Sequence, residues 1–422
     1  MEYLGQFIFL YPVVMSIVWM IGASYFYFRY ERNMPEYPEL KEFPLLTIMV
    51  AARNEEESIR ETVDGILKSE YPNFEVIVIN DGSTDRTGDI LHDIVTECPQ
   101  VRSLSLKTNL GKAAALNYGF LMSKGEIIVT IDADCLLDKK ALQWLTWHFV
   151  KFPRVGAVTG NPRVRNRTSL LAKIQTAEYS SVIGLIKRTQ RLLGKILTVS
   201  GVIAAFRRSA LIDTGLWSTD MATDDIDMTW KIEKAKWDVR YETNAIGWIL
   251  VPESLIGLWH QRVRWAQGGI EVLIRHRDVL TNWKDCRLWP LYLDYVVSVT
   301  WALTFIVTLF VWVLGYFFGI QIPFIPYSSP IPQWTGGVIA LICVIQFALS
   351  LFLDRKHDSN LLSVYFVVIW YPVIYWMYNA FAVIRAIPRA FLHKKGCSAT
   401  WKSPDRGIRV VDGVGGKSNV DH

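Results

Sequence analysis

The sequence predicts an α/β domain with a mostly parallel, Rossmann-like sheet, joined to an α-helical membrane region. Three observations support this prediction. Short apolar segments alternate with helical ones between residues 45 and 131, which is typical of a parallel sheet. Apolar segments long enough to cross a bilayer lie near both ends of the 422-residue chain. Acidic motifs follow the ends of expected strands, where such sheets bind ligands.

The amino-acid composition indicates a membrane protein. Hydrophobic residues make up 51% of the chain, which has 17 Trp and a mean hydropathy of +0.20, values above those of a typical soluble protein. The segment from Tyr3 to Phe28 has no charged residue and exceeds the roughly 20 helical residues that span a bilayer. A cleaved signal peptide is the alternative. Signal peptides begin with a basic region, whereas the only charged residue before this segment is Glu2. We expect a retained transmembrane helix over residues 1–30.

Three further apolar segments lie near the C-terminus, at residues 291–320, 334–353 and 361–384. Only the first of them contains a charged residue, Asp294. Each is long enough to span a bilayer. We therefore assign residues 290–388 to transmembrane or re-entrant helices and residues 389–422 to a tail.

Basic residues predict the orientation. Three cations follow the first span closely: Arg29, Arg32 and Lys41. The positive-inside rule therefore places the next domain, residues 31–252, in the cytoplasm. The tail region is also basic, through Arg385, Arg389, Lys394 and Lys395. One span before the domain and three after it would leave the tail outside, so we expect one segment to be re-entrant or interfacial. The last is our choice because Pro372 removes a helical hydrogen bond.

Cysteine and charge usage exclude two classes of function. The five cysteines are scattered and show no CxxC spacing, so we expect neither a disulfide framework nor a zinc site. The net charge of +5 is spread along the chain, and nucleic acid is not the expected partner. A lipid bilayer and an anionic ligand account for the charge.

The pattern of the cytoplasmic domain predicts its elements in order. Expected strands begin at Leu45, Phe74, Val101 and Glu126. Expected helices cover residues 55–68, 84–97 and 112–122. Beyond them we expect a polar helical segment at 163–191, a strand at 199–206, a helix at 223–236 and a pair of strands within 237–251.

Residues 253–289 are predicted to form amphipathic interfacial helices. One helical face would hold Leu255, Trp259, Val263, Ala266, Ile270, Leu273 and Leu280, and the opposite face Arg264, Glu271 and Arg275. This pattern suits the membrane interface, and packing on the soluble domain is the alternative. Gly268-Gly269 could divide the segment into two helices.

The motif VINDGSTD follows the second expected strand and contains Asp81. Its glycine allows a tight turn and a close approach of a ligand, so a base or ribose could bind there. A plain turn with Ser83 or Thr84 capping the next helix is an equal alternative. Lys112 begins a later helix, where it could contact a phosphate or lie on the surface.

The motif TIDAD places Asp132 and Asp134 after the strand that ends near Ile131. Carboxylates suit Mg²⁺ or Mn²⁺, and such ions often combine one or two carboxylates with phosphate oxygens. A cation on a diphosphate would neutralise a leaving group. A solvated acidic turn is the alternative for this motif taken by itself.

The motif TDDID places Asp224 and Asp225 at the start of an expected helix. A carboxylate beside a hydroxyl can act as a general base, and Asp225 is our candidate. The alternative is structural, with Thr223 capping the helix and the acidic residues complementing its dipole.

The motif QRVRW contains Gln261, Arg264 and Trp265. Gln261 and Trp265 are four residues apart and would share one side of a helix, with Arg264 near them. Tryptophan stacks on the apolar face of a sugar, and arginine binds phosphate through two hydrogen bonds. An anchor at the membrane surface is the alternative.

The four motifs, in this order, resemble the processive, membrane-integrated family 2 glycosyltransferases, which include cellulose, chitin and hyaluronan synthases. The resemblance runs from Leu45 to about Trp289. Longer segments are similar to bacterial poly-β-1,6-N-acetyl-D-glucosamine synthases over nearly the whole chain. Among them are TVSGVIAAFRRSAL (Thr198 to Leu211) and LWHQRVRWAQGG (Leu258 to Gly269).

This resemblance implies a GT-A fold and an inverting hexosyltransferase that polymerises N-acetylglucosamine from UDP-GlcNAc. The growing polysaccharide would cross the bacterial inner membrane into the biofilm matrix. The resemblance also implies a small membrane partner subunit and, in some systems, control by cyclic di-GMP. Because this chain has no spare domain for that regulator, such control would act through the partner.

The resemblance also implies roles for individual residues. Asp81 would contact uridine, and Asp132 and Asp134 would serve the diphosphate and its Mg²⁺ or Mn²⁺. Asp225 would be the base, beside Asp224, which stands where the family usually has Glu. Gln261, Arg264 and Trp265 would hold the diphosphate and the acceptor end of the polymer.

Two alternatives to a processive synthase remain. A non-processive enzyme that adds one sugar to a lipid carrier would use the first three motifs, with little reason for QRVRW. A non-catalytic membrane transporter or scaffold would use the acidic motifs as caps and turns.

Overall fold

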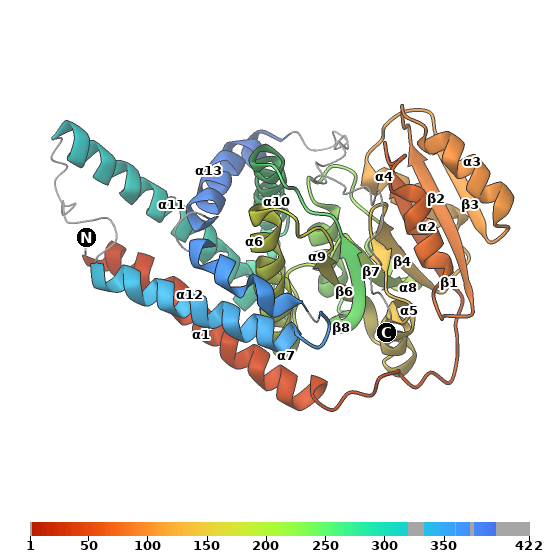
Figure 1. Cartoon of the computed structure of the whole chain (residues 1–422), viewed down its shortest axis with the longest axis horizontal. Helices are drawn as coiled ribbons and strands as arrows, with labels where there is room; N and C mark the ends of the chain where they lie inside the picture. The colour runs from red at the N-terminus through yellow and green to blue at the C-terminus, as the bar shows by residue number, and fades with distance from the viewer. Residues whose placement is uncertain (1, 320–332, 359, 372–374, 394–422) are drawn as a thin grey trace.

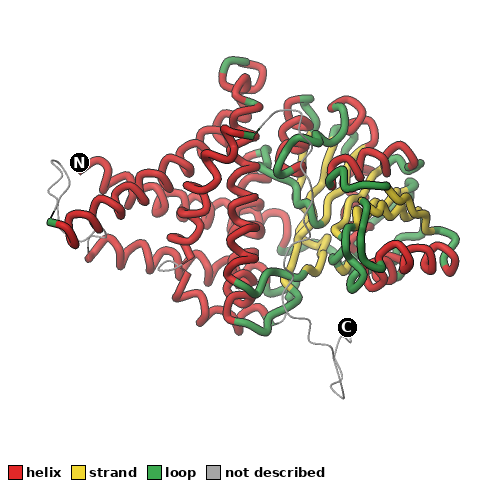
Figure 2. Tube along the Cα trace, turned by 90° about the horizontal axis from the view of Figure 1, so that it is seen from above, coloured by secondary structure: helices red, strands yellow, loops and turns green. Residues whose placement is uncertain are grey.

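The structure, a computed structural model, describes residues 2–319, 333–358, 360–371 and 375–393. An eight-stranded sheet with its covering helices forms one part of the molecule, and long helices extend away from it (Figures 1 and 2). The predicted α/β domain joined to a region of apolar helices is confirmed.

The first four strands of the sequence form the parallel part of the sheet. Strands β1 to β4 pair in the order β3-β2-β1-β4. They cover Leu46–Ala52, Phe74–Asp81, Val101–Leu106 and Ile127–Asp132. Helices α2 (Ile59–Leu67), α3 (Thr87–Glu97) and α4 (Lys112–Met122) connect them. Every strand and helix predicted between residues 45 and 131 is confirmed, with shifts only at the ends.

The rest of the sheet is mixed. Strand β7 (Ile203–Arg207) runs antiparallel to β4 and to β6 (Val155–Val164). Strand β8 (Asp238–Ile249) runs parallel to β6, and the short β5 (Leu136–Leu137) pairs with its far end. The predicted pair of strands within 237–251 is wrong, because β8 continues along β6 through two register shifts.

Helices cover both faces of the sheet. One apolar cluster joins β1 to α2, α3 and α5 (Ala141–Lys151), and a second joins β1 to α4, α8 (Arg208–Thr214) and α9 (Asp224–Lys234). Alternate β1 residues divide between the two clusters, as the side-chain period of a strand requires. Parallel pairing places the ends of β2 and β4 at one edge, where Asp81 and Asp132 lie.

The polar segment predicted as helical at 163–191 begins in a strand. Arg163 belongs to β6, and the helical part starts only at α6 (Leu170–Glu178). It continues through a π-helical turn, η2 (Tyr179–Leu185), into α7 (Ile186–Leu193). Helix α10 (Leu255–Arg275) then leads through the short 3-10 helices η3 (Arg277–Leu280) and η4 (Trp283–Leu288) into the apolar helices.

Three helical segments within the described residues are long and apolar enough to cross a membrane: Tyr3–Glu31, Trp283–Phe318 and Gly336–Asp354. They correspond to α1 (Glu2–Phe26) with η1 (Tyr27–Glu31), η4 with α11 (Trp289–Phe318), and α12 (Gln333–Asp354). The last apolar segment of the sequence instead forms η5 (Leu361–Trp370) and the separate helix α13 (Trp376–Leu392). Pro372, Lys394 and Lys395 lie outside the described residues.

Buried ion pairs attach two of these helices to the sheet domain. The guanidinium of Arg188 in α7 donates to Glu31 at the end of η1, 2.8 Å away, and pairs with Asp354 at the end of α12, 2.7 Å away. Arg163 of β6 also pairs with Asp354, at 2.8 Å. Because none of these four residues is more than 3% exposed, removing one partner would cost about 3–5 kcal/mol. The ends of η1 and α12 are thus held at the same side of the domain.

Helix α10 is continuous, so the segment is not divided at Gly268-Gly269, the division that the sequence left open. The two glycines instead permit close packing. A Cβ atom at Gly268 would lie 1.9 Å from Oγ1 of Thr223, and one at Gly269 would lie 1.7 Å from the hydroxyl oxygen of Tyr295. Figure 1 shows α10 between the sheet domain and α13, which packs along it.

Candidate active site

Asp81 ends β2 and is fully buried. Its Oδ1 accepts a hydrogen bond from the backbone N–H of Leu110 at 2.8 Å, and its Oδ2 accepts one from Gly111 at 2.9 Å. The next residue, Gly82, has a φ of +62°, and a Cβ atom there would lie 2.7 Å from the backbone of Thr108. The Asp81 carboxylate therefore fixes the loop before α4, and its contact with uridine stays a prediction.

Lys112, the first residue of α4, joins the TIDAD motif to the TDDID motif. Its Nζ forms an ion pair with Asp132 and donates to the carbonyl oxygen of Gly201 at 3.1 Å. Burial alone would lower the pKa of Lys112, but the carboxylates of Asp132, Asp224 and Asp225 raise it. A single, partly buried cation is thus shared by carboxylates from β4 and α9, which are far apart in the sequence.

Asp225 lies in the first turn of α9 and is held by backbone N–H groups. Gly201 donates to its Oδ2 at 3.2 Å, and Ile226 donates to its Oδ1 at 2.9 Å. Burial and the neighbouring Asp224 raise the pKa of Asp225 to about 6, against the opposing effect of Lys112 and Arg264. A raised pKa near the working pH is the property that a general base requires.

The loop before β7 is the common support of these side chains. Gly201 contacts both Lys112 and Asp225 through its backbone. The backbone N–H of Asp132 donates to the carbonyl oxygen of Val202 at 3.1 Å. The TIDAD and TDDID motifs are therefore positioned by one short loop.

The second TIDAD carboxylate lies toward η2 and α10. Burial raises the pKa of Tyr179, Arg262 opposes this effect, and the charges of Glu178, Asp134 and Asp132 add to it. Both TIDAD carboxylates are therefore within electrostatic range of the QRVRW helix.

The QRVRW side chains take different positions on α10. Arg264 is exposed, yet it lies close enough to Asp225 to lower the pKa of that carboxyl. Gln261 and Trp265 are partly buried, and Oε1 of Gln261 has no hydrogen-bond partner among the described residues. Arg262 is buried and pairs with Glu178 at 2.6 Å. TIDAD, TDDID and QRVRW are therefore close to one another, and Asp81 lies at the same sheet edge as Asp132.

The TDDID helix is tied to α10 at several points. Glu271 is buried, although it was expected on an exposed polar face, because its Oε2 accepts a hydrogen bond from Ala222 at 2.9 Å. Asp227 bonds His276 at 2.9 Å and accepts from Ser218 at 2.6 Å. Asp227 is therefore a structural link between α9 and the end of α10.

Sequence reasoning missed a second cation near Asp225, and this one is buried. Lys187 of α7 is 5% exposed, and its Nζ donates to Oγ1 of Thr159 at 3.2 Å. Burial lowers the pKa of Lys187 to about 7, against the opposing charge of Asp225. Thr159 in turn accepts from the backbone of Ser200 at 2.8 Å, so Lys187 supports the same loop. Lys187 lies in the polar run KRTQR, and such a run does not predict a buried side chain.

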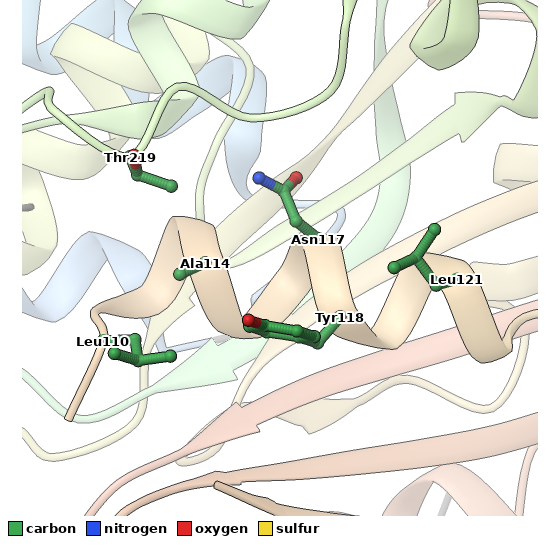
Figure 3. Close-up of a pocket in the computed structure, with 6 residues that line it drawn as sticks. All are labelled: Leu110, Ala114, Asn117, Tyr118, Leu121 and Thr219. Atoms are coloured by element: carbon green, nitrogen blue, oxygen red, sulfur yellow. The ribbon is translucent and has the colours of Figure 1, made fainter. Parts of the chain in front are cut away.

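A separate open groove of about 380 Å³ runs along α4. Figure 3 shows side chains of one helix face beside Thr219 of a facing loop. The lining residues are Leu110, Ala114, Asn117, Tyr118, Leu121 and Thr219. Because the lining contains no titratable carboxylate or cation, we place the chemistry at the carboxylate cluster and not in this groove.

The donor set fits a cation that arrives with phosphate. Among the described residues, no group of three or more His, Cys, Asp or Glu side chains could hold a metal ion by itself. Asp132 and Asp134 supply two carboxylates two residues apart. Mg²⁺ and Mn²⁺ are commonly bound by one or two carboxylates together with substrate phosphates.

The fold and the site define a membrane-associated, GT-A glycosyltransferase, in agreement with comparisons to known proteins. Residues 44–268 match the family described as "Glycosyltransferase like family 2". A solved mannosyltransferase from Pyrobaculum calidifontis, in complex with GDP-Man and Mn²⁺, aligns with a TM-score of 0.61 at 19% identity. The alignment covers 92% of this chain and 100% of the mannosyltransferase.

The chain is also similar to proteins named poly-beta-1,6-N-acetyl-D-glucosamine synthase. It is 41% identical over 408 residues to that of Staphylococcus epidermidis, covering 95% of this chain and 98% of the relative. It is 42% identical over 410 residues to that of Staphylococcus aureus strain COL, with the same coverage. The chain belongs to glycosyltransferase family 2, and the resemblance inferred from the motifs is confirmed.

Proposed function

We propose that this protein is a processive, inverting synthase that polymerises N-acetylglucosamine from UDP-GlcNAc into a β-1,6-linked chain. The observation that carries the proposal is the meeting of the TIDAD and TDDID carboxylates around Lys112, next to the QRVRW helix and at the sheet edge where Asp81 lies. The sugar and the linkage are supported by the names of relatives that match over 95% of the chain.

In the proposed reaction, Asp225 removes the proton from the acceptor hydroxyl. The acceptor oxygen attacks the anomeric carbon of the donor sugar, the bond to the diphosphate breaks, and UDP leaves with inversion. Lys112 and Arg264 stabilise the negative charge that develops on the leaving group. A divalent cation held at Asp134 and Asp132 would neutralise the diphosphate further.

The remaining candidate residues bind the acceptor end of the polymer and the uridine of the donor. Trp265 and Gln261 hold the acceptor end, since an indole ring stacks on a sugar. Uridine lies against the loop that Asp81 fixes. The buried Asp81 carboxylate already accepts two backbone hydrogen bonds, so in this proposal it acts on uridine mainly through that loop.

The raised pKa of Asp225 predicts the pH dependence of the reaction. Its carboxyl must be ionised to accept a proton, so kcat should rise with pH through about 6. Below that value the rate should fall about tenfold per pH unit, because the Asp225 carboxylate becomes protonated. An Asp with the ordinary pKa of about 3.9 would stay ionised in this range and would give no such fall. Initial rates between about pH 5 and 8 check this, with UDP-GlcNAc binding measured in parallel. A flat profile down to about pH 5 would contradict the assignment.

We propose three membrane spans, with the catalytic domain and the tail facing the cytoplasm at a bacterial inner membrane. Support comes from the ends of η1 and α12, which meet at the Arg188 ion pairs. Segment α1-η1 then enters, α11 leaves and α12 returns, while η5 and α13 lie at the interface. Four spans would leave the basic tail outside the cell, whereas three spans place it in the cytoplasm with the catalytic domain.

Labelling of single cysteines tests this topology. A cysteine at Lys356 or at Asn360, both exposed after α12, should react with a membrane-impermeant maleimide only from the cytoplasmic side. A cysteine at Gln333, the first residue of α12, should react only from the opposite side. Reaction of all these positions from one side would contradict three spans.

We retain residues 1–30, 31–252, 253–289, 290–388 and 389–422 as the proposed division of the chain. Export of the polymer into a biofilm matrix, a small membrane partner subunit and control by cyclic di-GMP through that partner are further proposals. The family resemblance supports them, and no described residue does so independently.

Product analysis tests the proposed function. Membranes that contain the protein are given Mg²⁺ with UDP-GlcNAc, UDP-glucose or UDP-glucuronate. UDP-GlcNAc alone should yield a polymer, and a β-1,6-specific hexosaminidase should degrade it. A polymer made only from another donor would assign the chain to a sibling synthase and overturn the proposed sugar.

A further inference from the structure

The second residue of QRVRW, Arg262, lies between a carboxylate and an aromatic ring. Its Nη2 donates to Glu178 at 2.6 Å and to the hydroxyl of Tyr375 at 3.2 Å. Its guanidinium carbon is 4.4 Å from the centre of the Trp265 ring. Arg262 is 8% exposed and Glu178 3% exposed, so water does not compete for these contacts.

The contacts of Arg262 join three helices that are remote in the sequence. Glu178 ends α6, Arg262 lies in α10, and Tyr375 precedes α13. Glu178 also accepts hydrogen bonds from the hydroxyls of Tyr375 at 3.1 Å and Tyr371 at 3.4 Å. The Arg262 charge thus has a fixed position, set by several partners on both sides.

We propose that Arg262 is a positioning residue for the acceptor, which it serves by holding the Trp265 ring in the orientation that receives the polymer end. The inference rests on the proposed function, because it takes Trp265 as the platform for the acceptor sugar. A cation over the face of an indole is attracted by the ring quadrupole, which restrains the ring. Since each added sugar must present its hydroxyl to Asp225, a loosely held platform would release the chain earlier.

A purely structural role is the competing explanation, in which the Arg262–Glu178 pair only packs α10 against α6. Replacing both charges by neutral side chains of similar size separates the two roles. A buried pair replaced in this way often leaves stability unchanged, whereas removing one partner leaves an unpaired buried charge. The double variant Glu178→Gln/Arg262→Met therefore keeps the packing and removes the cation from the ring.

The experiment compares product length and the KM for UDP-GlcNAc in purified variants. In the double variant the KM should stay within about twofold, and the mean polymer length should fall about tenfold, as expected for one lost cation–π contact. Arg262→Lys keeps the ion pair but carries its charge as a compact group that does not stack on the ring. It should fold and make chains of intermediate length.

The control is Arg167→Gln, which breaks the Arg167–Asp358 pair away from the site and should not change product length. Wild-type length in Arg262→Lys and in any folded double variant would overturn the inference. Equal loss of length in the control would do the same, because it would show a general effect of broken ion pairs. If the wild-type protein makes no polymer from UDP-GlcNAc, the proposed function fails instead.

Discussion

Replacing Asp225 by asparagine is expected to abolish polymer synthesis while UDP-GlcNAc still binds. Asparagine has nearly the same shape but does not accept the proton of the acceptor hydroxyl, so the rate should fall by about 10²–10⁴-fold. The amide oxygen can keep one of the backbone hydrogen bonds from Gly201 and Ile226. Polymer formation and the Kd for UDP-GlcNAc, measured on the same purified variant, check the prediction.

The matched control for Asp225→Asn is Asp278→Asn. Asp278 is an exposed carboxylate that pairs with Lys234, at the opposite end of α9 from Asp225. Its loss should leave polymer synthesis within about twofold of wild type, since exposed ion pairs contribute little. An active Asp225→Asn variant would remove Asp225 as the base.

Substituting Gly268 by alanine is expected to displace the TDDID helix and to lower both stability and activity. The new Cβ atom would lie 1.9 Å from Oγ1 and 2.5 Å from Cγ2 of Thr223, the residue directly before Asp224. Overpacking of this kind costs about 1–3 kcal/mol. A movement of about 1 Å at Asp225 can reduce the rate roughly a hundredfold. Thermal unfolding and kcat, measured together, check the prediction.

Two further variants test the cause of that effect. Gly337→Ala adds the same methyl group to α12 where no atom lies within 4 Å of the new Cβ, so stability and rate should not fall. Adding Thr223→Ala to Gly268→Ala removes the two nearest atoms and should restore part of the lost rate. Normal activity of Gly268→Ala alone would show that α9 is not held by contact with α10.

The parallel half of the sheet was predictable because its signals are local. Strands β1, β2 and β4 are largely apolar runs, whereas β3 mixes apolar and polar residues, and helical spacing separates consecutive strands. The pairing of β6 with β8 joins residues that are distant in the sequence. No local sequence pattern indicates this pairing. The sequence therefore predicts two strands where the structure has the single strand β8.

The candidate site was predictable where strand ends meet and less so where helices converge. Asp81 and Asp132 share one sheet edge because parallel strands place their carboxyl ends together. The approach of Asp225 to Lys112 depends on how α9 packs, which the sequence does not show. The burial of Arg262 depends on Glu178, which lies 84 residues away. An arginine in an amphipathic helix is usually an exposed residue.

The continuity of α10 across Gly268-Gly269 shows the same limit. Glycine weakens an isolated helix, and the sequence alone favours this local effect. In the folded chain, α9 and α11 approach α10 so closely at these positions that only glycine fits. The tertiary contact therefore overrides the local propensity.

The central claim is that one cytoplasm-facing site extends a polysaccharide, which crosses the membrane through the membrane helices of the same protein. Purified protein in sealed vesicles, with the catalytic domain outward, is given UDP-[¹⁴C]GlcNAc and Mg²⁺, and the product is sized with and without external hexosaminidase. We predict long polymers that resist the external enzyme until detergent opens the vesicles. A product limited to one sugar on a lipid, or a polymer fully degraded from outside, would contradict the account.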